Sequence, residues 1–77
     1  MQTTSKLYFR VERSRISFIR YIFEGYDGLA VLTTVDREAG RVVLSVAPGG
    51  EKLALRIMAD LAETILMEAG DPATPNH

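Results

Sequence analysis

Three segments of the chain carry the pattern of hydrophobic and polar positions that is typical of a β-strand. Residues 6–12 alternate strictly, with Leu7 and Phe9 on one side of the chain and polar or aromatic side chains on the other. Residues 29–35 form an apolar, β-branched run, and residues 41–47 alternate again. Because successive side chains of a strand point to opposite faces of a sheet, these patterns predict three strands.

Two further segments carry the period of an amphipathic helix. Between residues 14 and 26, large apolar side chains recur at spacings of three and four, and Ser14 stands where its hydroxyl could cap the first turn. Gly25 and Gly28 follow, and glycine commonly ends a helix. Residues 51–68 give the longest helical signal, with strong helix formers and no internal glycine or proline.

The predicted elements follow one another in the order β-α-β-β-α, and this order restricts the fold. A right-handed crossover makes the first and second strands parallel, and the third strand can pair between them. The sequence therefore predicts an α/β domain of the α+β type. It is a truncated ferredoxin-like fold with a three-stranded sheet of order 1-3-2 and both helices on one face. The outer edge of residues 6–12 is left open.

The domain is expected to span residues 6–69. The segments 1–5 and 70–77 carry few large apolar side chains, so we expect both to be disordered.

Composition excludes several classes of protein. The chain has 77 residues, nine Lys or Arg against ten Asp or Glu, one histidine and no cysteine. It therefore has no disulfide or thiolate, and no histidine cluster for a metal. No apolar run approaches the roughly 18–20 residues of a membrane span, and the near-neutral charge disfavours binding to nucleic acid. We expect a cytoplasmic domain with no cofactor, no metal, no nucleic-acid partner and no membrane partner.

The open strand edge and the sheet face turned away from the helices are the surfaces on which we expect a partner. On the predicted alternation that face carries Tyr8, Leu32 and Val43, and such apolar patches commonly mark interfaces. Arg10 lies along the open edge, where it could approach a carboxylate of another chain. Bare strand edges pair with other chains, and two-fold homodimers are the commonest oligomers. The leading hypothesis is a homodimer. Alternatively, an unknown protein partner pairs with the edge, or charges such as Lys6 and Arg10 only protect it.

A second hypothesis is the binding of a small anionic ligand. Arg13 and Arg15 flank the predicted start of the first helix, where free backbone amides favour an anion. Gly49 and Gly50 precede the second helix and could cradle an anion through backbone N–H groups. This turn lacks the length and the lysine of a phosphate-binding loop. The alternatives are a solvated basic face at the arginines and a simple helix start at the glycines.

The turn after the first predicted helix is the one candidate for catalysis, because it contains Glu24, Tyr26 and Asp27. Paired carboxylates can divide the roles of acid and base. However, no histidine, cysteine or lysine lies nearby in sequence to complete a catalytic group. A helix end and a solvated turn account for these residues, so we expect no enzymatic activity.

Several segments resemble a small bacterial family of single domains of unknown function. The resemblance rests on Tyr-Phe-Arg-Val at 8–11, on Glu-Gly-Tyr-Asp-Gly-Leu-Ala-Val-Leu-Thr-Thr at 24–34 and on Ala-Pro-Gly at 47–49. It implies a compact bacterial cytoplasmic domain with no established activity, so it supplies no catalytic residue.

The predicted strand order is also similar, at the level of the fold, to the amino-acid-binding regulatory modules of the ACT type. Those modules usually have a fourth strand, which this sequence is not predicted to form. The alternative function is therefore an ACT-like regulatory domain that binds a small ligand or an anion.

Overall fold

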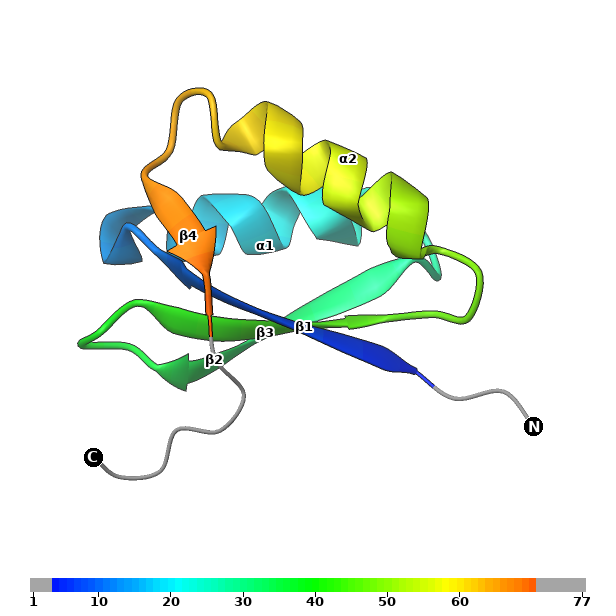
Figure 1. The fold of residues 1–77 in the computed structure, drawn as a ribbon, viewed down its shortest axis with the longest axis horizontal. Coiled ribbons are helices and arrows are strands. Elements are labelled where there is room, and N and C mark those ends of the chain that lie inside the picture. The colour runs from blue at the N-terminus through cyan, green and yellow to red at the C-terminus, as the bar shows by residue number, and fades with distance from the viewer. Residues whose placement is uncertain (1–3, 71–77) are drawn as a thin grey trace.

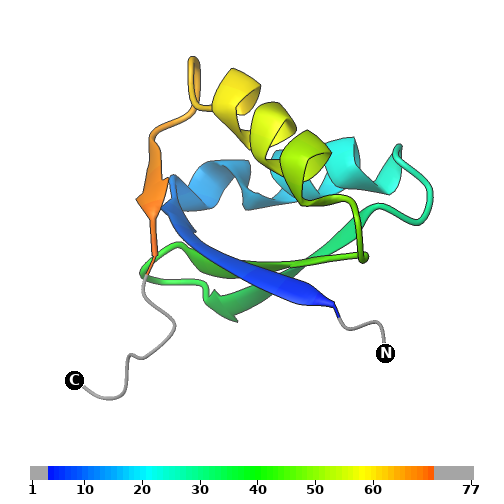
Figure 2. The ribbon, with the colours of Figure 1, turned by 45° about the vertical axis from the view of Figure 1, so that its right-hand side comes forward.

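A computed structural model of the chain describes residues 4–70, which form two layers. One layer is a β-sheet, and the other consists of two helices that lie on the same face of it (Figures 1 and 2). In chain order the elements are β1 (Ser5–Val11), the 3-10 helix η1 (Arg13–Arg15), α1 (Ile16–Glu24), β2 (Ala30–Asp36), β3 (Arg41–Val46), α2 (Glu51–Leu61) and β4 (Met67–Ala69).

The sheet has the strand order β2-β3-β1-β4, and every neighbouring pair is antiparallel. β3 lies between β1 and β2, as predicted, so β1 and β2 run in the same direction. The prediction of three strands is wrong, because β4 adds a fourth strand beside β1.

The predicted open edge of the first strand is therefore partly closed. β4 pairs with the half of β1 that runs from Phe9 to Val11. The N–H of Gly70 extends this pairing by donating to the carbonyl oxygen of Tyr8 at 2.7 Å. Figure 2 shows β4 alongside one end of β1 only.

The second helix is shorter than the predicted span 51–68, because it ends at Leu61. Ile65 stands four residues later, is 2% exposed and still donates its N–H to the carbonyl oxygen of Leu61. It therefore stays in phase with the helix, and the apolar period does not reveal the end. Beyond Ile65 the chain turns away to pair with β1. Leu53 and Leu66, two large apolar side chains within the predicted span, are both exposed.

The first helix also begins differently from its prediction. Ser14 lies in η1, and its hydroxyl approaches the Glu12 carboxylate at 3.5 Å instead of capping the helix. α1 starts at Ile16 without a side-chain cap and ends at Glu24, as the glycines that follow indicated. None of the helices within residues 4–70 is long and apolar enough to cross a membrane.

The hydrophobic core fills the space between the sheet and the two helices. Leu7 and Phe9 pack against it, as the alternation of the first strand predicted. Its buried side chains come from every element except η1 and β4, and one comes from the turn after α2. They are Val11, Ile16, Ile19, Phe23, Leu32, Val42, Leu44, Val46, Ala54, Ile57, Met58 and, in the turn, Ile65.

The structure describes one part of each terminal segment. Ser5 is the first residue of β1, and Gly70 forms a hydrogen bond with Tyr8 of the same strand. Both residues therefore belong to the folded domain, although the sequence placed them in the terminal segments. Residues 1–3 and 71–77, where disorder was expected, lie outside the described residues.

Gly40 is the last residue of the turn between β2 and β3. No other residue can occupy this position without strain. Its φ is +73°, in the left-handed region, and its carbonyl oxygen accepts the N–H of Val11 at 2.8 Å. A β-carbon at Gly40 would collide with the backbone carbonyl oxygen of Val11. The close approach of the hairpin to β1 therefore depends on this glycine.

Replacing Gly40 with alanine should destabilise the domain by at least about 3 kcal/mol, because backbone strain and steric overlap add together. Urea unfolding followed by circular dichroism measures the loss. Gly49→Ala is the matched control, since Gly49 also has a positive φ (+86°) but a β-carbon there meets no atom within 4 Å. It should cost about 1 kcal/mol. Equal losses for the two variants would contradict the steric role of Gly40.

Candidate functional site

The face of the sheet turned away from the helices has an apolar centre. The register places Tyr8, Val43 and Thr33 side by side across β1, β3 and β2. Val31 and Val35 of β2 lie beside this row and are 65% and 50% exposed. We call these five residues the open-face patch. Neither α1 nor α2 covers it, since both lie on the opposite face (Figure 1).

One end of the same face is charged. The register places one charged side chain from each strand in a single row: Glu68, Arg10, Arg41 and Asp36. Arg10 and Glu68 form an ion pair of 2.9 Å. The apolar patch is therefore bordered by charges at the hairpin end of the sheet.

β2 forms the second edge of the sheet, and no described segment pairs with its outer side. The carbonyl oxygen of Leu29 accepts the N–H of Ala47 and so points toward β3. Because the direction alternates along a strand, the backbone groups of Ala30, Leu32 and Thr34 point outward. β2 contains no proline or lysine, which are common protections of an edge strand, and its one charged residue is at its end.

The four residues predicted to form an interface lie in different parts of the structure. Tyr8 and Val43 are neighbours on the open face, where the sequence placed them. Leu32 was placed there wrongly: it is 4% exposed and belongs to the core. Its register partner is Leu44, so it faces the helices. Arg10 pairs within the chain with Glu68, and β4 occupies the edge that was expected to bind a partner.

The residues predicted to bind an anion lie at opposite ends of the sheet. β1 begins beside the end of β3, near Gly49 and Gly50, and its other end leads to Arg13 and Arg15. The two pairs therefore do not form one site. Arg13 is neutralised by Glu38 of the hairpin at 2.8 Å, and Arg15 is exposed.

The start of α2 already carries a negative charge of its own. The carboxylate of Glu51 accepts the hydroxyl of Ser5 at 2.6 Å. This hydrogen bond, together with the backbone N–H groups of Glu51 and Gly49, holds the pKa of Glu51 below its ordinary value of 4.5. A second anion at Gly49 and Gly50 would meet this carboxylate. The geometry therefore argues against the predicted anion site.

Two turns that are distant in sequence meet around a surface hollow of about 460 Å³. One is the turn before β2, and the other is the glycine turn before α2. Tyr26 and Leu53 contribute exposed apolar surface to it. The hollow is lined by Tyr26, Asp27, Gly28, Leu29, Ala47, Pro48, Gly49, Gly50 and Leu53.

The three residues considered for catalysis do not all meet there. Tyr26 and Asp27 line this hollow, whereas Glu24 lines another one beside Tyr21. Residues 4–70 contain no group of three or more histidine, cysteine or acidic side chains that could hold a metal.

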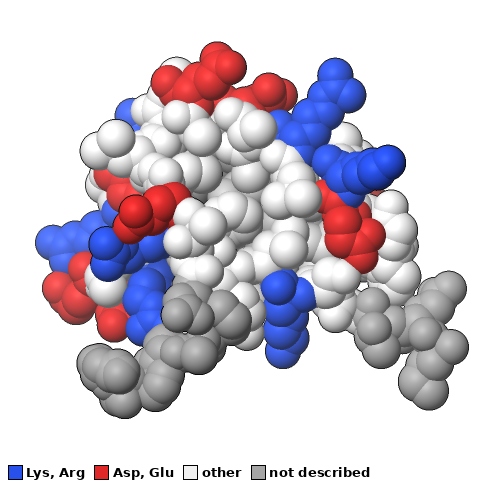
Figure 3. Space-filling view, viewed as in Figure 1, with Lys and Arg blue, Asp and Glu red and all other residues white. Residues whose placement is uncertain are grey.

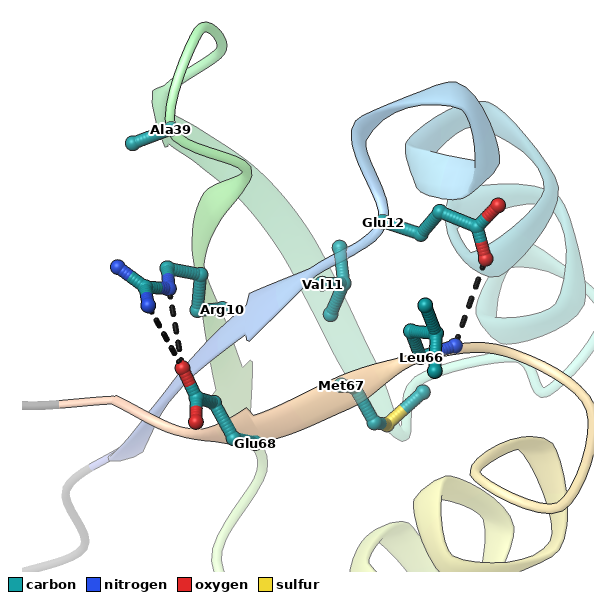
Figure 4. Close-up of a pocket in the computed structure, with 7 residues that line it drawn as sticks. All are labelled: Arg10, Val11, Glu12, Ala39, Leu66, Met67 and Glu68. Carbon is teal, nitrogen blue, oxygen red and sulfur yellow. Dashed lines mark hydrogen bonds and ion pairs between the residues drawn. The ribbon is translucent and has the colours of Figure 1, made fainter.

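A second hollow, of about 360 Å³, lies where β1 and β4 meet the hairpin (Figure 4). Its three charged side chains, Arg10, Glu12 and Glu68, already have partners within the chain. Arg10 pairs with Glu68, and the N–H of Leu66 approaches the Glu12 carboxylate at 3.4 Å. Figure 3 shows basic and acidic side chains mixed at this end of the molecule, over the hairpin and η1. On the face shown, the arginines therefore do not form a continuous basic patch.

One family profile matches residues 9–65, which is more than half of the chain. The family is described as a domain of unknown function, DUF4911. The chain belongs to this family. Neither the curated proteins nor the solved structures gave a match.

Membership in DUF4911 confirms the coarser part of the resemblance seen in the sequence, namely a small domain of unknown function. The matched residues of the DUF4911 domain include β2, β3 and both helices, and they end before β4.

The sequence pattern did not identify the exposed side chains of β2 in this DUF4911 domain. The run 29–35 has apolar residues at both odd and even positions, so alternation could not decide which side chains face the helices. Val31 and Val35 were therefore not recognised as surface residues. Ser5 was missed because its partner, Glu51, is 46 positions away. No local pattern connects them.

Glu51→Gln should reduce stability near neutral pH and should matter less in acid. Because the pKa of Glu51 is lowered on folding, its carboxylate stabilises the fold above pH 4.5. This contribution disappears as the pH falls through the lowered pKa. Urea unfolding of both proteins between pH 7 and pH 3 measures the difference, and Ser5→Ala should reproduce part of it.

The exposed Glu63, in the turn after α2, supplies the control for loss of one negative charge. Glu63→Gln should leave the pH dependence close to that of the original protein. A constant difference between Glu51→Gln and the original protein across the whole pH range would argue against the role of this carboxylate.

Proposed function

We propose that the chain is a non-enzymatic protein-interaction module that works as a homodimer. Two copies meet on the uncovered side of the sheet, where the open-face patch adjoins the free edge of β2. The observation that carries this proposal is the exposure of Val31, at 65%, on an edge strand that no described segment pairs with.

The distribution of apolar surface supports this side of the sheet. Burial of exposed valine and tyrosine side chains favours association, at roughly 25 cal/mol per Å² of apolar surface removed from water. An unprotected edge adds backbone hydrogen bonds that a partner strand can complete. The open-face patch and the β2 edge are contiguous, because Val31, Thr33 and Val35 belong to both.

The proposed fold assignment is a ferredoxin-like domain. The chain order β1-α1-β2-β3-α2-β4 and the strand order β2-β3-β1-β4 support it, because the split β-α-β arrangement places the third strand between the first and the second. The homodimer would then join two sheets on the β2 side.

The original protein should have a solution mass twice its chain mass of 8.5 kDa at micromolar concentration, measured by light scattering. Val31→Lys should raise the dissociation constant of the dimer at least ~100-fold, because it places a charge within the apolar interface in both copies.

Leu55→Lys is the matched control for this substitution. Leu55 is 47% exposed but lies on α2, on the other side of the sheet. It should leave the dimer intact. A monomeric original protein would overturn the proposed function, and so would an equal effect of the two variants.

A second candidate function is the binding of a small uncharged ligand. It is favoured by the hollow of about 460 Å³ between the turns before β2 and α2. Tyr26 and Leu53 offer apolar surface there, while Asp27 and the neighbouring Glu51 disfavour an anion. This chemistry differs from the anion suggested by the sequence.

A thermal-shift screen with small aromatic and aliphatic amides tests this candidate. A ligand at concentrations about 100 times its Kd should raise the melting temperature by several degrees, because it stabilises the fold by about 2.7 kcal/mol. The shift should disappear in Leu53→Lys and persist in Leu55→Lys. Inorganic phosphate should give none. If no amide raises the melting temperature, this candidate is wrong.

A further inference from the structure

The flank of α1 that overhangs the β2 edge carries one positive and one negative charge. Arg20 reaches down to the edge strand, where its guanidinium donates to the hydroxyl of Thr34 at 3.3 Å. Glu24 lies four residues later on the same flank, and it forms no ion pair with any residue between 4 and 70. Residues that are four positions apart in a helix are neighbours on one of its faces.

The position of Glu24 along the edge follows from helix and strand dimensions. Four residues of helix rise about 6 Å, which is roughly the length of two strand residues. α1 leads into β2 through the turn at its C-terminal end, so Glu24 lies nearer the start of β2 than Arg20 does. With Arg20 taken as level with Thr34, to which it donates, we infer from these dimensions that Glu24 lies level with Leu32.

The edge itself can pair with a copy of itself around Thr33. In an antiparallel pair with a two-fold axis there, Leu32 of each copy lies opposite Thr34 of the other. Leu32 and Thr34 are the residues whose backbone groups point outward, so the pair is hydrogen-bonded. The irregularity between Thr34 and Asp36 lies outside these pairs. On the open face, Val31 would meet Val35 of the partner subunit.

This register brings the two charges on α1 together across the axis. Arg20 is level with Thr34, and Thr34 lies opposite Leu32 of the other copy. Glu24 of the partner subunit is level with that Leu32, so it lies opposite Arg20. The symmetry repeats the contact, so two ion pairs form. An axis at Leu32 would instead place the two Glu24 carboxylates at the same level. The charges therefore favour the axis at Thr33.

We propose, on the basis of the homodimer proposed above, that two copies join β2 to β2 around Thr33. Arg20 of each copy then pairs with Glu24 of the partner subunit. The two sheets become one continuous eight-stranded sheet. The open-face patches of both copies lie on the same side of it.

Charge reversal tests this arrangement. Arg20→Glu and Glu24→Arg each turn both cross-axis attractions into repulsions, so each variant alone should dimerise at least ~10-fold more weakly than the original protein. Mixing the two variants in equal amounts should restore dimers, because one chain then offers two acidic groups and the other two basic groups. Light scattering of each variant and of the mixture measures the result.

The mixture separates contacts between chains from contacts within one chain. An attraction between Arg20 and Glu24 of the same helix would be lost in both variants and would not return on mixing. Thermal unfolding of each variant shows that the chains remain folded. Recovery in the mixture supports the proposal, and its absence overturns the proposal.

Two further outcomes distinguish this register from the homodimer itself. If Val43→Glu splits the dimer and neither charge reversal weakens it, the copies meet face to face, and only the β2 pairing is wrong. If the original protein is a monomer at every concentration, both the homodimer and the pairing are wrong.

Discussion

The pairing of β4 with β1 determines what the rest of the surface can do. Three residues of β4 occupy the edge of the sheet next to Phe9–Val11. The chain reaches this position because Ile65 anchors the end of the α2 segment in the core, while the N–H of Glu12 binds the carbonyl oxygen of Leu66 at 2.9 Å. Once this edge is occupied, β2 is the long strand whose outer backbone groups have no described partner.

The two-layer construction explains why one face of the sheet stays uncovered. Both helices are needed on the same side to bury the core side chains of β1, β2 and β3. A chain of 77 residues has no further helix within residues 4–70 to place on the other side. Small domains bury a smaller fraction of their surface than large ones, so association is a common way to bury more. The exposed valines of β2 are the apolar surface that this small domain leaves unburied.

The sequence predicted those parts of the fold that depend on local periodicity. The alternation around Phe9 identified the core side of β1, and the crossover rule placed β3 between its neighbours. Local periodicity failed at Leu32, because that strand carries apolar residues on both of its faces. It failed again at Ile65, whose position continues the helical phase after the helix has ended. Contacts between distant segments decide both cases.

Contacts between distant segments also change the electrostatics around the residues that were expected to bind an anion. Arg13 looked free in sequence, but folding brings Glu38 to it from the hairpin, 25 positions away. At the other end of the sheet, folding brings Ser5 to Glu51, so that a carboxylate already lies at the start of α2. A count of charges near a residue in sequence therefore gives little information about the electrostatics of its surroundings.

The difference between the two sheet edges bears on the size of the proposed assembly. An edge that pairs with a different edge of the next copy generates open-ended stacks, whereas an edge that pairs with itself closes after two copies. Here the β4 edge is three residues long and displays the charged pair of Arg10 and Glu68. The β2 edge is seven residues long, with Val31 and Val35 symmetrically placed about Thr33. If the long β2 edge pairs with itself as proposed, opposite a short charged edge, the assembly closes as a pair of chains and does not extend into a fibre.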